Sequence, residues 1–272
     1  MVNDAAATIT EIDTGALANS DTLIPTSKAV TTAIAGVGSG GFGGLYVNLS
    51  IKNNSTNPNY QMDVSATTIL LENSSKAILR IDALSETVDI TASGVNGLDT
   101  GSEAGSTWYH IWAIAKADGT KDCLLSASAT APMLPAGYTY KAYLGAVYNN
   151  ASSNFGSFIQ TNNKVVIPEV YALAGGSELA WTSVSLSTII PSTAKAFSGY
   201  LIAHSTPSSI PGSYLSSTVA GFGVIMVSFN ATLNSIFISP LGSVMVIEAQ
   251  TTYYNNYLAG NSVDILISMF EY

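Results

Sequence analysis

Residues 108–127 read WYHIWAIAKADGTKDCLLSA and contain the clearest structural signal of the chain. The dipeptide Asp118-Gly119 lies between two runs of apolar residues. Asp-Gly is a preferred pair for a tight two-residue turn, because both central positions of such a turn need a positive φ. We therefore expect a β-hairpin with strands over 108–117 and 121–127.

Short apolar runs separated by turn residues continue on both sides of this hairpin. From residue 45 onward, clusters of Gly, Pro, Asn and Ser separate runs rich in β-branched and aromatic residues, which is typical of an all-β sandwich or barrel. Pro168 and Glu169 interrupt the pattern, so we predict an all-β fold with two β-sandwich modules, 45–168 and 169–272. The other strands that we expect span residues 45–51, 67–71, 77–81, 140–148, 165–167, 196–204, 222–229, 235–239, 244–249 and 263–270.

Several of the expected strands are apolar on both faces, whereas an antiparallel strand normally alternates between apolar and polar residues. Residues 108–115 and 222–229 carry apolar side chains at positions of both parities. Residues 169–272 contain only one lysine and five acidic residues as charged groups. A second apolar face is most simply buried against an identical neighbour in a closed oligomer. The pattern thus predicts a homo-oligomer.

The first 44 residues differ from the rest because they contain few aromatic residues. Thr22 or Asp21 is suited to cap a helix, Pro25 fits its first turn, and Gly36 follows residues 26–35 as a stop. We expect a short helical stalk within residues 1–37, followed by a glycine-rich linker over 38–44. The linker formally satisfies G-x-G-x-x-G. A dinucleotide fingerprint needs a strand before it and a helix after it, however, and the order expected here is the reverse.

The composition argues against several classes of protein. The 272 residues include 47% hydrophobic and 10% charged residues, with a net charge of −9. Nine basic residues against eighteen acidic ones leave no basic surface for nucleic acid. No run reaches the roughly 18 apolar residues of a spanning helix, so we expect no membrane insertion. Cys123 is the only cysteine, which fits folding in a reducing cytoplasm.

Residue types that carry out catalysis are sparse. A Ser or Cys nucleophile needs a histidine as its base, and the chain has only His110 and His204, with no G-x-S-x-G motif. Acidic residues within 82–89 (Asp82, Glu86, Asp89) and 99–103 (Asp99, Glu103) have the spacing of a glycosidase pair, but solvated loops or strand edges are the simpler interpretation. We therefore predict that the protein is not an enzyme.

Metal and cofactor sites are likewise not indicated. No two His or Cys residues lie at ligand spacing. Asp118 and Asp122 with a carbonyl group would suit a loop calcium, although Asp118-Gly119 is more simply a turn. A threefold axis would also gather one histidine from each of three chains. We predict no cofactor and no metal site built by one chain.

Aromatic residues in two expected loops are more suggestive of binding. One loop contains Tyr214, and the other precedes the last strand and contains Tyr253, Tyr254, Asn255, Asn256 and Tyr257. Flat rings beside amides and hydroxyls suit the stacking and hydrogen bonding of a sugar. Tyrosines that lie in the core or in an interface are the equal alternative. These six residues are the candidate sugar-binding residues.

Two stretches resemble bacteriophage tail fibres. Residues 24–30, IPTSKAV, resemble a segment that recurs in tail-fibre chains before their distal domains. Residues 97–103, 107–109, 124–128 and 135–138 resemble, in preserved order, a second block common in phage and prophage tail proteins. The resemblance implies a homotrimer in the virion, assembled in the host cytoplasm.

The same resemblance implies that the two ends of the chain bind different partners. Its N-terminal side would join other tail or baseplate proteins, and its C-terminal tip would bind a host surface polysaccharide such as lipopolysaccharide, capsule or another wall polysaccharide. It transfers no binding residues to this sequence. A structural tail or baseplate fibre without a receptor, and a polysaccharide-cleaving spike, remain the alternatives. The spike is weakened because the chain is short and lacks the repeats of a long β-helix.

Overall fold

The computed structural model describes residues 12–13, 24–25, 45–205, 212–228 and 236–272. Every regular element in these ranges is a β-strand, which confirms the all-β class, and none of these residues forms a helix long and apolar enough to cross a membrane. The expected helix over 26–35 and the linker over 38–44 lie outside the described residues. Pro25, expected in a first helical turn, lies instead in the two-residue strand β2 (Ile24–Pro25), which pairs in parallel with β1 (Ile12–Asp13).

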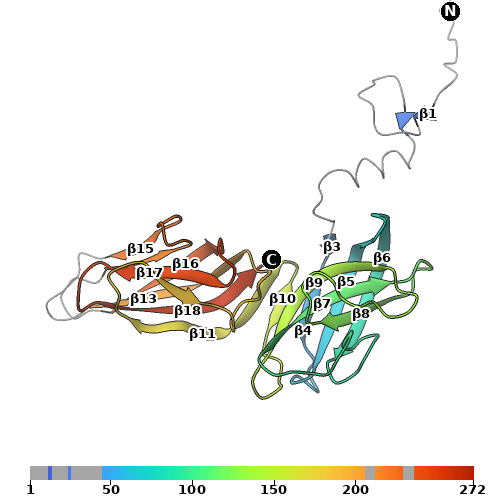
Figure 1. Cartoon of the computed structure of the whole chain (residues 1–272), viewed down its shortest axis with the longest axis horizontal. Coiled ribbons are helices and arrows are strands. Elements are labelled where there is room, and N and C mark those ends of the chain that lie inside the picture. The colour runs from blue at the N-terminus through green and yellow to red at the C-terminus, as the bar shows by residue number, and fades with distance from the viewer. Residues whose placement is uncertain (1–11, 14–23, 26–44, 206–211, 229–235) are drawn as a thin grey trace, which may run out of the picture.

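The remaining strands form two lobes that lie side by side (Figure 1). The first lobe contains β3 (Leu45–Val47), β4 (Ser50–Asn53), β5 (Gln61–Asn73), β6 (Ile78–Asp89), β7 (Thr107–Ala115), β8 (Lys121–Ser126), β9 (Tyr140–Asn149) and β10 (Ile159–Thr161). The second contains β11 (Lys164–Gly176), β12 (Thr182–Ser185), β13 (Ala196–His204), β14 (Gly212–Ser216), β15 (Ile225–Ser228), β16 (Ile236–Met245), β17 (Thr251–Asn256) and β18 (Ser262–Glu271).

One 12-stranded sheet runs through both lobes. Its order is β16-β13-β18-β11-β10-β4-β5-β9-β7-β8, and β3 and β6 pair with β5 at the side. Strand β11 makes the connection, because it pairs with β10 of the first lobe and with β18 of the second. The boundary predicted near residue 168 falls inside β11, at a register shift between Val166 and Val170. Pro168 has no N–H to donate to the ladder, which accounts for an irregularity at this point.

The predicted hairpin is present as β7 and β8, with Ala115 opposite Lys121. Its loop spans residues 116–120 and is longer than the two residues expected. The Lys116 N–H donates to the Thr120 carbonyl at 2.9 Å, and the Gly119 N–H donates to the Lys116 carbonyl at 3.1 Å. Gly119 has a φ of 91°, so the glycine of the Asp-Gly pair occupies the position that needs the left-handed region.

Both faces of β7 are buried within the chain itself. Ile111 packs in the main core, and Trp112 and Ile114 pack on the other face in a second cluster with Tyr138 and Leu134. The last two residues come from the segment between β8 and β9, which folds over this face. This corrects the expectation that the second face of this strand needs an identical neighbour.

The second lobe places a separate four-stranded sheet, in the order β12-β17-β14-β15, against the large sheet. Leu201 and Ile265 of the large sheet and Leu215 and Tyr254 of the small sheet are buried in the same core. Strands β14 and β17 correct the expectation of loops around residues 211–214 and 251–257. The strand expected over 244–249 is also absent as a separate element, because β16 continues to Met245 and a turn follows.

The outward face of the large sheet in the second lobe is exposed and apolar. Tyr171, Tyr200, Ile236 and Ile238 form this apolar face, with exposed fractions of 57%, 37%, 66% and 57%. The ladder aligns Tyr200 with Tyr171 through the intervening strand β18, and aligns Ile238 with Ile202. On the same side, His204 Nε2 lies 2.9 Å from Asp264 Oδ2, so these two side chains form a hydrogen bond within the chain.

Candidate functional site

The candidate sugar-binding residues lie on neighbouring strands of the small sheet. Tyr253, Tyr254, Asn255 and Asn256 belong to β17, and Tyr214 belongs to β14, which pairs with β17. Tyr214 lies directly opposite Asn255 in this ladder. The fold therefore brings together two segments that are about 40 residues apart in the sequence.

The alternation of β17 sorts its four candidate residues onto two faces. Tyr254 points into the core and is 4% exposed, and Asn256 is 3% exposed. The Asn256 amide donates to the Gly176 carbonyl at 3.0 Å and accepts a hydrogen bond from the Ser213 hydroxyl at 2.7 Å. Tyr254 and Asn256 therefore belong to the interior of the lobe and not to an exposed surface.

Tyr253 and Asn255 point outward together with Tyr214. Trp181, just before β12, joins them, because its ring centroid lies 6.4 Å from that of Tyr214 in an edge-to-face arrangement. We call the surface formed by Trp181, Tyr214, Tyr253 and Asn255 the tyrosine face. Tyr257 follows the end of β17 and is 64% exposed at the border of this sheet.

Exposed apolar residues extend the tyrosine face toward β15. Met226 lies opposite Tyr214 in the ladder, and its side chain is exposed. Phe222, in the turn before β15, is 71% exposed. Some of the apolar side chains within residues 222–229 are therefore exposed in the single chain.

Two polar groups set the hydrogen-bonding character of the tyrosine face. The Tyr253 hydroxyl donates to Glu248 Oε2 at 2.6 Å, and this hydrogen bond raises the pKa of the Tyr253 phenol. The Oδ1 atom of Asn255 is buried and accepts no hydrogen bond from the residues that the structure describes. A buried acceptor without a donor costs about 1–3 kcal/mol.

The sequence does not predict Trp181 as a sugar-binding residue. It lies in a Ser- and Thr-rich stretch next to the four-residue strand β12, which is too short to give a periodic signal. The one available signal was a tryptophan surrounded by small polar residues. Large aromatic side chains in such surroundings often have one apolar surface and one wet edge.

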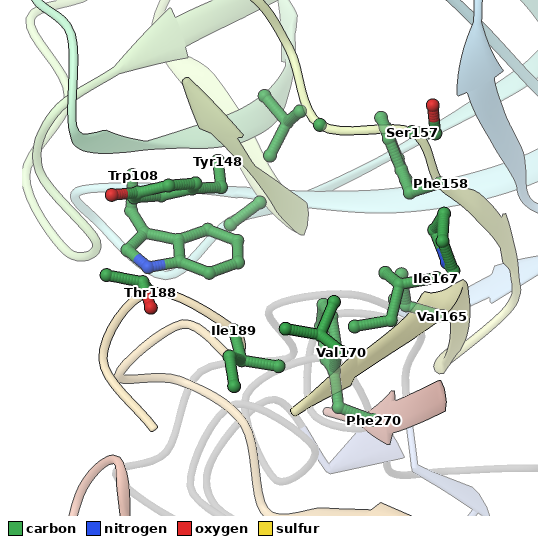
Figure 2. Close-up of a pocket in the computed structure, with 14 residues that line it drawn as sticks. Trp108, Tyr148, Ser157, Phe158, Val165, Ile167, Val170, Thr188, Ile189 and Phe270 are labelled. Carbon is green, nitrogen blue, oxygen red and sulfur yellow. The ribbon is translucent and has the colours of Figure 1, made fainter. Parts of the chain in front are cut away.

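A separate cavity of about 220 Å³ lies where the two lobes meet (Figure 2). Trp108, Tyr148, Phe158 and Phe270 contribute aromatic side chains to its wall. The Trp108 indole N–H donates across the junction to the Ser187 carbonyl at 2.7 Å. The described part of the wall has no carboxylate, histidine, lysine or cysteine side chain, so it offers no acid, base or nucleophile of these types.

The two histidines lie in different environments. His110 is buried, with its Nδ1 atom 3.1 Å from the Tyr143 hydroxyl, and burial lowers its pKa to about 4. His204 pairs with Asp264 on the apolar face. Burial, together with the negative charges of Glu86 and Asp122, raises the pKa of Cys123 well above its ordinary value, so this thiol is not activated as a nucleophile.

The acidic residues considered for catalysis or calcium binding have partners within the chain. Asp82 accepts hydrogen bonds from Thr68 and Arg80, and these bonds lower its pKa. Glu86 and Glu103 accept from the side-chain amides of Asn96 and Asn149. In the described parts of the chain, no three His, Cys, Asp or Glu residues group as a metal site would require.

The chain matches no protein-family model, and a search of the curated proteins finds no match.

Proposed function

We propose that this chain is a receptor-binding part of a bacteriophage tail fibre that recognises a host cell-surface polysaccharide without cleaving it. The observation that carries the proposal is the tyrosine face, where Trp181 and Tyr214 lie edge to face beside Asn255. Aromatic rings stack on the apolar faces of sugars, and nearby polar groups fix their hydroxyls. A pair of rings beside the polar side chains of Asn255 and Tyr253 has both properties.

The charge of the region favours a neutral sugar at this face. Glu248, an acidic group beside this face, already accepts a hydrogen bond from the Tyr253 hydroxyl at 2.6 Å. The tyrosine face itself carries tyrosine, tryptophan and asparagine side chains and no lysine or arginine. Recognition would then depend on stacking and on hydrogen bonds to hydroxyl groups rather than on ion pairs.

The absence of cleavage is part of the proposal and has a chemical basis. A glycosidase needs two carboxyl groups placed on either side of the scissile bond. The four residues that define the tyrosine face include no carboxylate, and Glu248 beside it accepts a hydrogen bond from Tyr253. Binding without a second carboxylate gives adsorption but not hydrolysis.

A homotrimer is the assembly that we propose for the fibre, with two β-sandwich modules carried on the stalk of residues 1–37. The apolar face supports it, because the side chains of Tyr200, Ile236 and Ile238 are exposed on an ordered sheet, beside the hydrogen-bonded pair His204 and Asp264. The apolar face and the tyrosine face belong to opposite sides of the second lobe. Association through the apolar face would leave the tyrosine face of each chain free. Three weak sugar sites would then act together in one trimer.

The binding proposal is tested with the purified chain and polysaccharide from the surface of the host. We expect Tyr214→Ala to weaken binding about tenfold or more, because it removes a stacking ring. Tyr60→Ala, at an exposed tyrosine of the first lobe, is the matched control and should bind as the wild type does. Equal binding by both variants would remove the tyrosine face from the proposal. Release of reducing ends would show a cleaving spike, and no binding at all would favour a structural tail or baseplate protein.

The trimer is tested by light scattering. We expect a mass three times that of the chain, and we expect Ile238→Asp to lower the mass, because a charge on the apolar face opposes burial. Lys52→Asp, at an exposed position of the first lobe, controls for a general effect of charge. A wild-type monomer would contradict the proposed assembly.

A further inference from the structure

A groove of about 860 Å³ lies on the first lobe, far along the chain from the tyrosine face. Its wall comes from the turn between β5 and β6, from the start of β9, and from the segment that covers β7. We call it the lysine groove, because it contains two of the nine basic residues of an acidic chain. The residues that line it include Glu72, Lys76, Trp112, Thr130, Tyr138 and Lys141.

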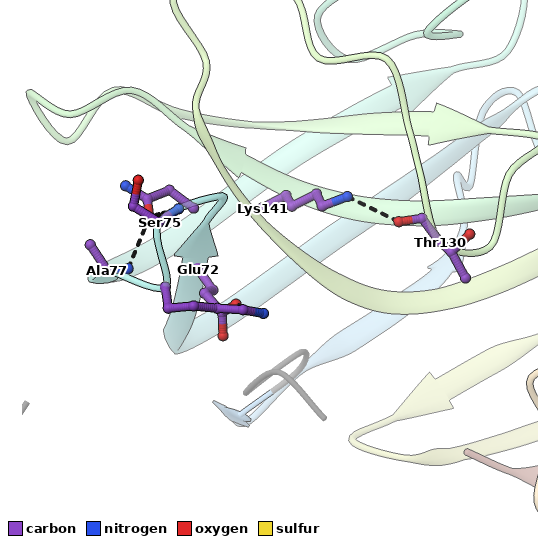
Figure 3. A network of polar contacts seen from close by, with 7 residues as sticks. Glu72, Ser75, Ala77, Thr130 and Lys141 are labelled. Carbon is purple, nitrogen blue, oxygen red and sulfur yellow. Dashed lines mark hydrogen bonds and ion pairs between the residues drawn. The ribbon is translucent and has the colours of Figure 1, made fainter. Parts of the chain in front are cut away.

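One of the two lysines, Lys141, has no counter-ion among the described residues. Lys141 lies opposite Glu72 in the β5–β9 ladder, where an ion pair would be expected. Glu72 instead binds the ammonium group of Lys76 at 2.6 Å. Lys141 extends toward the Thr130 carbonyl and donates to it at 3.0 Å (Figure 3), and no ion pair of Lys141 with a described acidic residue exists.

The surroundings of Lys141 remove its charge partly from water. The side chain is half-buried, and burial lowers its pKa. The Trp112 ring, whose centroid lies 5.0 Å from the Nζ atom, gives the ammonium group a cation–π contact but no negative charge. A partly buried charge without an opposite charge is stabilised less than it would be in water. An anionic group in the groove would supply the missing partner.

A second donor in the same groove also lacks a partner. The indole Nε1 of Trp112 is buried and donates no hydrogen bond to any described residue. Trp112 is 5% exposed and lines the groove together with Lys141. The groove thus combines an unpaired ammonium group with an unused N–H donor, and one acceptor group with two oxygen atoms matches that pair.

We propose that the lysine groove binds the carboxylate of an acidic sugar, with Lys141 as its counter-ion and Trp112 as a further donor. A singly charged carboxylate suits the single unpaired ammonium group, whereas doubly charged phosphate would lie near the Glu72 carboxylate with too little positive charge. The hydroxyls of Thr130 and Thr139 in the wall suit hydrogen bonds to the hydroxyls of a sugar ring.

This inference rests on the proposed function in one respect, namely that the carboxylate belongs to a sugar and not to another organic acid. The groove and the tyrosine face share no residue, so they can be tested one at a time. Loss of sugar binding in the groove would leave the effect of Tyr214→Ala on polysaccharide binding unchanged.

The experiment is a titration of the ¹⁵N-labelled full chain with glucuronic acid, followed by the indole N–H signals of Trp108, Trp112 and Trp181 in ¹H–¹⁵N TROSY spectra. The Trp112 signal is assigned by its loss in Trp112→Phe. We expect glucuronic acid to shift the Trp112 signal in a saturable way, and an equal concentration of glucose to leave it in place. The affinity should fall about tenfold or more in Lys141→Met, which keeps the aliphatic stem and removes the charge.

Lys52→Met is the matched control, because Lys52 is an exposed lysine on β4 of the same lobe, and it should bind as the wild type does. Unchanged signals of Trp108 and Trp181 show that each variant is folded. The proposal is overturned if glucose shifts the Trp112 signal as glucuronic acid does, or if Lys141→Met keeps its affinity. Tighter binding of inorganic phosphate than of glucuronic acid would overturn the choice of a carboxylate.

Discussion

The Nδ1 atom of His110 lies 3.1 Å from the hydroxyl oxygen of Tyr143, and the same hydroxyl lies 2.7 Å from Thr193 Oγ1. His110 and Tyr143 belong to the first lobe, and Thr193 precedes β13 of the second. Tyr272, at the end of the chain, also reaches the first lobe, where its hydroxyl accepts a hydrogen bond from the Ala146 N–H at 2.6 Å. Polar side chains thus connect the lobes across an otherwise apolar junction.

Stability should decrease in mild acid because of His110. Burial lowers its folded-state pKa to about 4, against about 6.5 in the unfolded chain, so the unfolded state binds more protons between these values. The contribution is fully present above pH 6.5 or so and is lost as the pH falls toward 4. At pH 5 the free energy of unfolding should be lower by about 2 kcal/mol than at pH 7.5.

Urea unfolding at the two pH values measures this effect in the wild type and in His110→Asn. The wild type should lose more stability than the variant. The difference between the two losses gives the contribution of His110 separately from that of the acidic residues. His204→Asn serves as the control and should keep the His110 contribution. Equal losses in wild type and His110→Asn would contradict the assignment.

Neighbouring tyrosines on β17 should differ sharply in their effect on stability. Tyr254→Ala removes a ring from the core and should cost about 3–5 kcal/mol in the free energy of unfolding. Tyr253→Ala removes an outward ring and one exposed hydrogen bond, so it should cost about 1 kcal/mol or less. Chemical denaturation compares the two variants. Similar costs would contradict the predicted difference, and a larger cost for Tyr253→Ala would show that the strand has the opposite parity.

Glycine is required at position 199 of β13. A Cβ atom there would overlap the carbonyl oxygen of Leu266 and approach the Ile267 Cα to 2.9 Å on the paired strand β18. Gly199→Ala should therefore lower the free energy of unfolding by about 3 kcal/mol, since the backbone must shift. Gly242→Ala has open space around its new methyl group and should change stability by about 0.5 kcal/mol or less. A Gly199→Ala protein as stable as this control would refute the close approach of the two strands.

The thiol of Cys123 should be unreactive in the folded protein. Its side chain is fully buried, and burial raises its pKa well above the ordinary value. A thiol-specific reagent should modify one group per chain in denaturant and essentially none without it. Rapid modification of the native protein would show that this part of the core opens readily.

The sequence could predict those strands that carry a strong apolar signal. Strand β13 has the bounds expected, and the β7–β8 hairpin is present, because both consist of apolar and aromatic runs next to clear turn residues. The sequence instead predicts loops where β14 and β17 lie. Ser, Thr, Asn and Tyr dominate these segments, and Ser, Thr and Asn are also common in turns.

The candidate site could be predicted only in part for a related reason. Residues 251–256 read TTYYNN, so each residue type occurs once at each parity and the letters cannot tell which face is buried. The pairing of β17 with β12 and β14 determines which face of β17 is buried, and it buries Tyr254. The covering of Trp112 by Tyr138 likewise depends on the path of a long connection, which no local pattern specifies.

Competition for adsorption examines the proposed receptor binding in its biological setting. The number of free phage particles is counted after mixing host cells with a phage that encodes this chain, if the proposed origin holds, in the presence of the purified protein. We expect the wild-type protein and Tyr60→Ala to reduce adsorption, and Tyr214→Ala at the same concentration to leave adsorption close to its level without competitor. Folded wild-type protein that leaves adsorption unchanged, or Tyr214→Ala that competes as well as wild type, would contradict binding of the receptor through the tyrosine face.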